Sequence, residues 1–354
     1  MKNNNRKKYM KNKKRVVVAM SGGVDSSVAA ALMVEKGYEV IGLTMQLYDE
    51  NNKKSVNSKS CCAGQDIYDA KNVAEKLGID HYVLNYETRF FKNVIKDFAD
   101  TYAEGKTPIP CIRCNERVKF RDLFNTAMGL EAEILVTGHY ANIKNNKSGI
   151  SLHKAYDKDK DQSYFLFATP IDVLEKIAFP LGNMHKSSTR EYAKKMDLPV
   201  LDKPESQDIC FVQSNKKGGY REIVQKLRPD ASLSGDIVHV NGSILGKHNG
   251  IDGFTIGQRR GLGVNSTTGN PLYVTKIDPK KKIIFVGEEN DLLVNEFRSV
   301  DMTWLSKISV GSKFSATVKI RSQHDPVKAK IYVEDEKKAV ISFEKPCPGV
   351  APGQ

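Results

Sequence analysis

The chain has 354 residues, which is too long for a single typical hydrophobic core. Its formal net charge of +13 at pH 7 attracts polyanions such as RNA. Its longest apolar stretches are strand-sized, and residues 1–15 are rich in Lys and Asn without an apolar signal region, which argues against membrane-spanning and exported proteins. We therefore expect a cytoplasmic protein of roughly two or three domains, with a disordered basic tail over residues 1–14 and no membrane partner.

A buried apolar strand is predicted over residues 15–20, and it leads into a turn rich in glycine and serine that opens a helix. Gly22 and Gly23 can adopt positive φ and allow a ligand to approach the backbone closely. Hydroxyl donors join the amides at the positive end of the helix and come from Ser21, Ser26 and Ser27. The turn has neither the Gly-Lys-Ser/Thr of a Walker A motif nor the G-x-G-x-x-G of a dinucleotide fold. The sequence therefore predicts a phosphate-binding loop of another kind.

Alternating strands and helices continue to about residue 204. Further strands are predicted over residues 38–45, 81–85 and 134–137, with helical spacing of apolar residues between them. Gly37 and Gly78 stand where helix C-caps belong. This order predicts an α/β domain with a doubly wound parallel sheet over residues 15–204.

The ligand site of such a sheet lies at the carboxyl ends of its strands. The phosphate-binding loop, Met45 and Gly138 would gather at this edge. Met45 there either contacts an adenine or packs at the end of its strand.

The pattern changes after residue 204. Residues 205–272 combine a predicted helix over 220–227 with short strands and turn signals at Asn241-Gly242, Asn249-Gly250 and Asp252-Gly253, which indicates a small mixed domain. Residues 273–354 alternate as an antiparallel β-barrel does, with strands predicted over 317–321, 328–333 and 339–343.

Three cysteines occur in two informative contexts. Cys111 and Cys114 follow Pro110 in a predicted loop near the start of a helix, where the helix N-terminus with Arg113 or Arg117 would favour the thiolate. Cys210 lies further along the chain. Without a signal region these thiols are not expected to form structural disulfides. The residues alone leave three roles open for these cysteines. They could perform nucleophilic or redox chemistry, hold a metal ion together with Cys61 and Cys62, or be inert buried thiols.

Several motifs occur together and in a characteristic order. They are the phosphate-binding loop, Lys59-Ser60-Cys61-Cys62, residues 107–120, Thr137-Gly138-His139-Tyr140, residues 160–165, Asp208-Ile209-Cys210-Phe211, residues 257–263 and Pro352-Gly353-Gln354. From residue 15 onward the chain resembles the tRNA-specific 2-thiouridylase family, whose SGGxDS loop marks the PP-loop ATP pyrophosphatases. The resemblance implies a PP-loop domain of the adenine nucleotide alpha hydrolase type, and a sulfurtransferase that adenylates the C2 oxygen of the wobble uridine of tRNA and replaces it with sulfur.

The resemblance also implies roles for individual residues. Cys114 matches the nucleophile and Cys210 the thiol that receives sulfur as a persulfide from a donor protein, either a cysteine desulfurase or a sulfur-relay carrier. The family uses ATP with Mg²⁺, and the positions that match its ATP contacts are Ala19, Met20, Ser21, Gly22, Gly23, Val24, Asp25, Ser26, Met45 and Gly138. Contacts to tRNA, including its target base, are matched by Ile109, Pro110, Cys111, His139, Lys160, Asp161, Gln162, Arg321, Ser322 and Gln354. No residue is assigned as a ligand of a resident metal.

Two departures from the family pattern matter. Some members carry Asp at the position of Cys111, so an acid-base role does not transfer to this thiol. Relatives continue beyond the position of Gln354, so we expect a truncated barrel with an unclosed sheet edge.

Three alternatives stay open beside this function. An iron-sulfur cluster on Cys111, Cys114 and Cys210 could deliver the sulfur in the same reaction. A PP-loop ligase or amidotransferase would use nitrogen in place of sulfur and would not need the thiol pair. An RNA-binding protein could retain the ATP fold without its activity.

Overall fold

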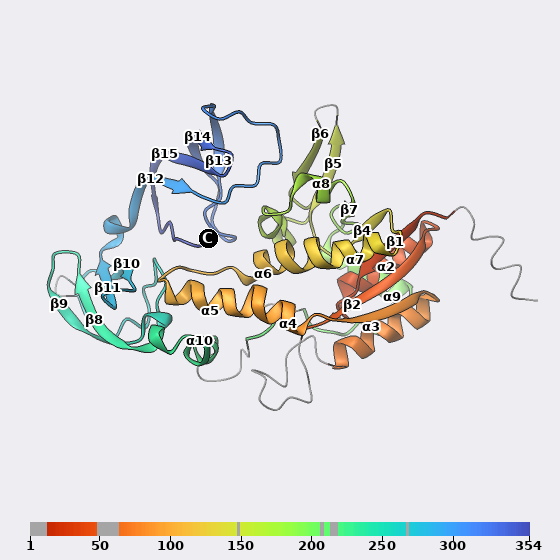
Figure 1. Ribbon diagram of the computed structural model, residues 1–354, viewed down its shortest axis with the longest axis horizontal. Coiled ribbons are helices and arrows are strands. Elements are labelled where there is room, and N and C mark those ends of the chain that lie inside the picture. The colour runs from red at the N-terminus through yellow and green to blue at the C-terminus, as the bar shows by residue number, and fades with distance from the viewer. Residues whose placement is uncertain (1–12, 48–63, 147–148, 206–208, 213–218, 267–268) are drawn as a thin grey trace, which may run out of the picture. The chain divides into compact units, whose positions relative to one another are not determined.

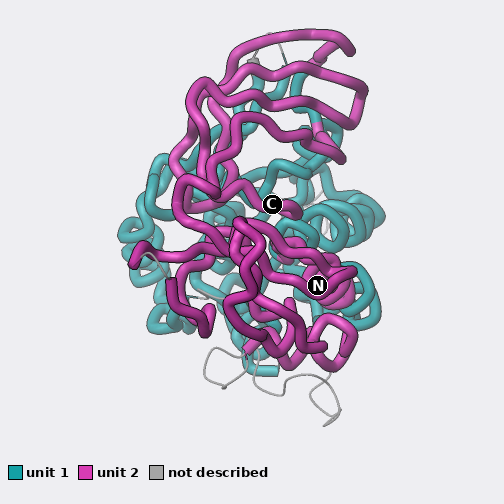
Figure 2. Tube along the Cα trace, turned by 90° about the vertical axis from the view of Figure 1, so that its left-hand side faces the viewer, with its two compact units in different colours: residues 1–93, 111–213, 304–306 teal, residues 94–110, 214–303, 307–354 magenta. Residues whose placement is uncertain are grey.

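The computed structural model describes residues 13–47, 64–146, 149–205, 209–212, 219–266 and 269–354. The chain divides into two compact units, one of residues 1–93, 111–213 and 304–306 and the other of residues 94–110, 214–303 and 307–354 (Figure 2). Most of the predicted basic tail and the pair Cys61-Cys62 lie outside the described residues. Within the described part of the chain, every helix is too short or too polar to cross a bilayer.

A five-stranded parallel sheet in the order β3-β2-β1-β4-β7 forms the centre of the first unit. Its strands are β1 (Arg15–Ala19), β2 (Glu39–Gln46), β3 (Asp80–Asn85), β4 (Ile134–Val136) and β7 (Ile177–Ala178). The apolar run of β1 is buried on both faces, as a central parallel strand requires. Since β2 and β4 flank β1 on opposite sides, the strand order reverses direction at β1, where open α/β sheets bind ligands.

Helices cover both faces of this sheet. Val16 and Val18 of β1 point to one face and belong to a core with α2 (Val24–Glu35), α3 (Gly64–Leu77) and residues of α9 (Lys186–Lys195). Figure 1 shows α2 beside β1 and β2, and α9 packs against α2. Val17 points to the opposite face and packs with the π-helical segment η2 (Cys114–Leu123) and α7 (Phe124–Gly129).

Shorter elements complete this part of the chain. They are α4 (Glu87–Phe90), η1 (Phe91–Ile95), α6 (Pro110–Arg113), the hairpin of β5 (Asn142–Asn146) and β6 (Gly149–His153), η3 (Lys158–Lys160), η4 (Ser163–Leu166) and α8 (Ile171–Leu174). Gly37 and Gly78 have φ of +83° and +65°, as the predicted C-cap positions require.

The second unit contains two further four-stranded sheets and the helices α5 (Lys96–Ala103) and α10 (Arg221–Leu227). A mixed sheet in the order β10-β11-β8-β9 consists of β8 (Ser234–His239), β9 (Ile244–Asn249), β10 (Tyr273–Asp278) and β11 (Ile283–Gly287). An antiparallel sheet in the order β12-β15-β14-β13 consists of β12 (Leu293–Ser299), β13 (Lys313–Val318), β14 (Val327–Asp335) and β15 (Lys338–Pro348). Single 3₁₀ turns are η5 (Pro229–Ser232), η6 (Ile251–Gly253) and η7 (Glu289–Leu292).

The predicted fold class is confirmed: a parallel α/β sheet is followed by mixed and then antiparallel β structure. The strand predicted over residues 317–321 is wrong in its second half, because β13 ends at Val318. Val318 pairs with Val327, so the next pair along the ladder would use Pro326, which has no N–H to donate. Arg321 therefore lies in the connection between β13 and β14.

Candidate nucleotide and thiol site

The phosphate-binding loop connects β1 to α2, and glycine is required at two of its contacts. Gly22 has a φ of +72°, and a Cβ atom there would collide with the carbonyl of Asp66. Gly138 follows β4, and a Cβ atom there would lie 2.7 Å from the backbone nitrogen of Ser26. The first approach packs the loop against α3, and the second brings the end of β4 to the first turn of α2, as predicted for the ligand edge of the sheet.

Hydroxyl groups fix the shape of this loop from within. The Ser26 Oγ accepts from the Ser21 N–H at 3.1 Å and donates to the Gly23 carbonyl at 3.1 Å. The fully buried Ser27 donates to the same carbonyl at 2.8 Å. Ser27 therefore stabilises the loop and is not exposed to a ligand, which corrects the expectation that its hydroxyl faces a phosphate.

Asp25, in the first turn of α2, is the centre of a polar network. The Lys186 Nζ donates to both of its carboxylate oxygens at 2.7 and 2.8 Å, and the Tyr140 hydroxyl donates to Oδ1 at 2.9 Å. Burial raises the pKa of Tyr140, and the neighbouring Asp25 charge adds to this effect, so the phenol stays protonated as a donor. Thr189 lies 2.9 Å from the same phenol oxygen. The carboxylate of Asp25 is thus held in one orientation at the loop.

Glu205 joins this network with three cations around its carboxylate. Lys160 lies 2.7 Å from it, Lys186 3.4 Å and Arg190 3.7 Å. The hydrogen bond from Lys160 holds the pKa of Glu205 below its usual value, and the same bond raises the pKa of Lys160. Both partners are therefore charged at neutral pH.

Lys203, two residues before Glu205, connects the phosphate-binding loop to α3. Its Nζ donates to the Gly22 carbonyl at 3.0 Å and to the carboxylates of Asp66 and Asp69 in α3. Burial raises the pKa of Asp66, and the ammonium of Lys203 opposes this rise. Sequence reasoning missed Lys186, Lys203 and Glu205. Lys186 and Lys203 each bond a residue more than a hundred positions away. Glu205 meets its cationic partners only in the folded chain.

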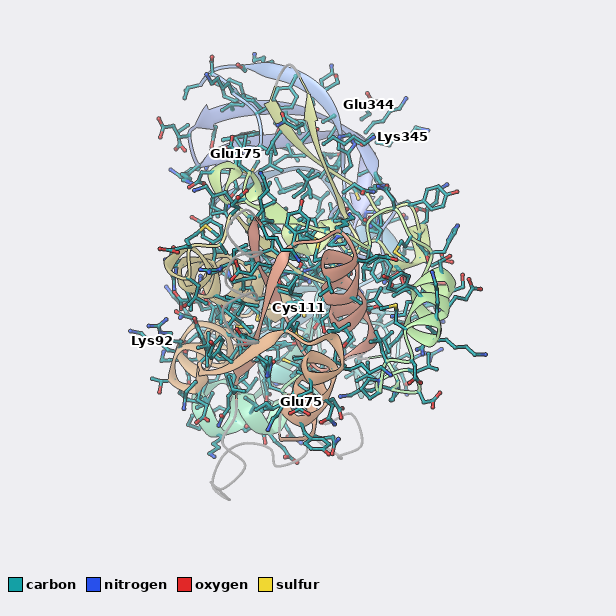
Figure 3. The ribbon with its side chains drawn as sticks, turned by 90° about the vertical axis from the view of Figure 1, so that its right-hand side faces the viewer. Glu75, Lys92, Cys111, Glu175, Glu344 and Lys345 are labelled. Atoms are coloured by element: carbon teal, nitrogen blue, oxygen red, sulfur yellow. The ribbon has the colours of Figure 1, made fainter. Side chains whose placement is uncertain are left out.

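Cys111 and Cys114 lie in helical turns, so the predicted loop is wrong at these positions. Cys111 belongs to α6, is exposed and is labelled in Figure 3, whereas Cys114 begins η2 and is buried. Burial raises the pKa of the Cys114 thiol, and Lys119 opposes this only in part. Arg113 donates to Glu116 at 2.9 Å, and Arg117 lies 3.6 Å from the same carboxylate. The expectation that these two arginines favour the thiolate is therefore wrong.

Cys210 is partly buried and follows Glu205 by five positions. The adjacent Phe211 is almost fully buried and packs edge-on against Phe90, with the ring centroids 6.0 Å apart. This contact anchors the chain beside the thiol. Among the residues that the structure describes, which include Cys111, Cys114 and Cys210, no three His, Cys, Asp or Glu side chains are grouped to hold a metal ion.

Comparison with known proteins identifies the family. A family model described as tRNA methyl transferase HUP domain matches residues 14–214, and models described as tRNA methyl transferase PRC-barrel domain and Aminomethyltransferase beta-barrel domain match residues 221–288 and 294–354. The tRNA-specific 2-thiouridylase MnmA of Rickettsia felis is 52% identical over 337 residues, which are 95% of this chain and 90% of that protein. The chain belongs to the tRNA-specific 2-thiouridylase family.

A second relative agrees with this assignment. The protein of the same name from Rickettsia bellii is 51% identical over 336 residues, with 95% of this chain and 90% of that protein covered. Among solved structures, an NMN synthetase from Francisella tularensis is similar at a TM-score of 0.34 and 22% identity, over 64% of this chain and 81% of that one. The family models and the two Rickettsia relatives confirm the 2-thiouridylase family that the sequence resembles.

Several residues that the family resemblance assigns to tRNA have contacts within the protein. The Asp161 carboxylate accepts from the Ala155 and Ser163 N–H groups, and the Gln162 Oε1 accepts from the Tyr140 N–H at 2.9 Å. The Arg321 Nη2 donates to the carbonyls of Ile256 and Gly349, both at 2.8 Å. These three side chains shape the backbone around them.

His139 and Met45 have largely apolar neighbours. The imidazole of His139 packs against the rings of both Phe120 and Phe179, and its Nδ1 lies 2.8 Å from the Thr137 Oγ1. Burial holds the pKa of His139 well below its usual value, so the ring is neutral. Met45 packs against the same core as Val17, consistent with the strand-end alternative, and its contact with adenine stays a prediction.

The structure divides the remaining predicted residues between the two units. The nucleotide set from Ala19 to Ser26, with Met45 and Gly138, lies in the first unit, together with Cys111, Cys114, His139, Lys160 and Cys210. Ile109, Pro110, Arg321, Ser322 and Gln354 belong to the second unit.

Proposed function

We propose that this chain is a tRNA 2-thiouridine synthase that uses ATP to replace the C2 oxygen of the wobble uridine with sulfur. The observation that carries this proposal is the 52% identity to a tRNA-specific 2-thiouridylase over 95% of the chain. The glycine-lined loop at the carboxyl end of β1 and the retained Cys114 and Cys210 support it.

The first half of the reaction activates the uridine. Its C2 oxygen bonds to the α-phosphorus of ATP while the bond to pyrophosphate breaks, and AMP attached through oxygen becomes a leaving group. Amides of the loop and the N-terminus of α2 stabilise the charge that develops on the phosphates. Mg²⁺ is held in proteins by one or two carboxylates together with substrate phosphates, and Asp25 is the carboxylate that suits this role. Bound there, the ion would offset phosphate charge.

The second half transfers sulfur. The terminal sulfur of a Cys210 persulfide bonds to C2, and AMP departs with the original oxygen. The Cys114 thiolate then attacks the Cys210 sulfur, the bond between the Cys210 sulfur and the transferred sulfur breaks, and its electron pair stays on the thiouridine sulfur. A Cys114–Cys210 disulfide forms, and a thiol reductant restores both thiols with two electrons.

The partners follow from this chemistry. They are tRNA, whose target base must leave its stack to reach the site, and a donor protein that carries a persulfide, either a cysteine desulfurase or a relay carrier. The iron-sulfur alternative is not favoured, since the described cysteines are not grouped as cluster ligands. The same identity to a thiolating enzyme disfavours the ligase and the inactive RNA-binding protein.

Two cysteine variants test the proposed function on unmodified tRNA with ATP and a ³⁵S-labelled persulfide donor. We expect Cys210→Ser to release pyrophosphate but to form no thiouridine, and Cys114→Ser to retain labelled sulfur on the Cys210 peptide. Cys347→Ala is the control, because this thiol lies in β15 of the second unit. Unchanged thiolation in both site variants, or the absence of thiouridine with the wild-type protein, would refute the proposal.

A further inference from the structure

Lys186 and Arg190 present two positive charges from one face of α9, because they are separated by one helical turn. The Lys186 side chain is only 12% exposed, whereas that of Arg190 is 37% exposed. An ammonium group this deeply placed needs ionic partners, and Lys186 has two, Asp25 and Glu205. The family resemblance assigns a role to neither cation.

The distances around Glu205 divide its partners into a tight and a loose group. Lys160 bonds it at 2.7 Å, which is a full charge-assisted hydrogen bond, while Lys186 and Arg190 lie at 3.4 and 3.7 Å. Lys186 makes its short bonds to Asp25 in the phosphate-binding loop. Glu205 can therefore keep Lys160 and give up the two cations of α9.

A second anion beside these cations would suit the local charge. Lys160, Lys186 and Arg190 all approach the single carboxylate of Glu205. Two further carboxylates act on this group, since Asp25 pairs with Lys186 and the charge of Asp157 acts on Lys160. Arg190 pairs with Glu205 alone among these carboxylates, so its charge is the least compensated of the three. Phosphate oxygens accept strong hydrogen bonds from both ammonium and guanidinium groups.

We propose that Lys186 and Arg190 bind the β- and γ-phosphates of ATP, and then the pyrophosphate that leaves, and that Glu205 occupies this site when nucleotide is absent. The inference rests on the proposed function and names residues of the same site. In the reaction, the two cations would stabilise the charge that grows on the departing pyrophosphate. A backbone phosphate of tRNA is the competing occupant, but the low exposure of Lys186 and its bonds to the loop carboxylate favour the nucleotide.

Calorimetric titration of the full chain with magnesium pyrophosphate, and separately with AMP, tests this site. We expect Lys186→Gln to weaken pyrophosphate binding about tenfold or more, and Lys186→Arg to recover most of the loss. We expect Glu205→Gln to strengthen pyrophosphate binding several-fold, because a competing anion has been removed. AMP affinity should stay within about twofold in all three variants, which shows that the loop has kept its structure. Lys195→Gln is the matched control, because Lys195 is an exposed lysine on the same helix.

The sign of the Glu205→Gln effect separates this site from a purely structural ion pair, whose loss would weaken binding. A weaker or unchanged pyrophosphate affinity in Glu205→Gln would overturn the inference. The inference would also be overturned if Lys186→Gln bound pyrophosphate normally and lost affinity for tRNA instead. Thiolation by the wild type with unchanged pyrophosphate affinity in Lys186→Gln would refute the site alone. Pyrophosphate binding that depends on Lys186, without thiolation, would refute the proposed function alone.

Discussion

Cys114 combines a predicted nucleophilic role with an environment that opposes its reactive form. The residue is 9% exposed, and burial disfavours the charged thiolate. The cation that lowers the pKa of this thiol is Lys119. Arg113 and Arg117 pair with Glu116 instead. At neutral pH the resting site thus holds a thiol, and reactivity depends on how much thiolate forms.

The pH dependence of Cys114 alkylation follows from its raised pKa. Below that pKa the thiolate fraction increases about tenfold per pH unit, so the rate of reaction with iodoacetamide should still be rising at pH 9. Lys119→Gln should move the profile to higher pH, because it removes the charge that lowers this pKa. Tryptic cleavage after Arg113 places Cys111 and Cys114 in separate peptides, so mass spectrometry can follow each thiol. A plateau in the rate below pH 8 would contradict the prediction.

The same shift has a consequence for stability. Because the folded protein keeps the Cys114 proton to a higher pH than the unfolded chain, the contribution of this group to the free energy of unfolding is fully present below its ordinary pKa. It is lost as pH rises through the folded-state value.

At the scale of elements, the site depends on how closely the end of β4 approaches the first turn of α2. The residue between them is Gly138, which leaves no room for a side chain against Ser26. Ser26 is also the residue whose hydroxyl bonds the Ser21 N–H and the Gly23 carbonyl, so a shift of this turn would act on the loop.

Gly138→Ala should abolish pyrophosphate release and lower the free energy of unfolding by about 1–3 kcal/mol, because the added methyl group must push α2 away from β4. Pyrophosphate release and denaturant unfolding would measure the two effects. Gly129→Ala is the control: this glycine ends α7, has open space around it and should be neutral or slightly stabilising. Normal pyrophosphate release by Gly138→Ala would show that the close approach is not needed.

At the scale of the whole molecule, the net charge of +13 is suited to a nucleic acid partner. Charge of this kind acts through phosphate contacts and counterion release, which makes affinity depend on salt. It does not select a sequence, so recognition of the target base must come from the site itself.

Binding of tRNA should weaken steeply with salt, with a linear dependence of log K on log salt concentration. Arg321→Ala should reduce the magnitude of this slope by about one unit if Arg321 contacts a phosphate. The same change removes donors to the carbonyls of Ile256 and Gly349, so thermal unfolding must be measured beside filter binding. Lys195→Gln, outside the predicted tRNA set, should leave the slope unchanged. An affinity that does not change with salt would refute electrostatic recognition of RNA.

The sequence by itself determined the features whose signals are local. The buried runs of β1 and β2, the C-caps at Gly37 and Gly78 and the glycine-serine loop each depend on neighbouring residues, so periodicity and turn chemistry predicted them. The family could be named in the same way, because an ordered set of short motifs is a property of the chain. The interaction of Arg113 with Glu116, three residues away, was also within reach of such reasoning and was missed.

Only the tertiary structure decided which charges meet and which groups lose water. Lys186 and Asp25 are 161 positions apart, and no local pattern links them. The end of β13 depends on the Pro326 that would face it across the sheet, and the raised pKa of Cys114 depends on burial by several elements. Ion pairing and desolvation depend on distance in space and on packing density, and neither is encoded in the spacing of residues along the chain.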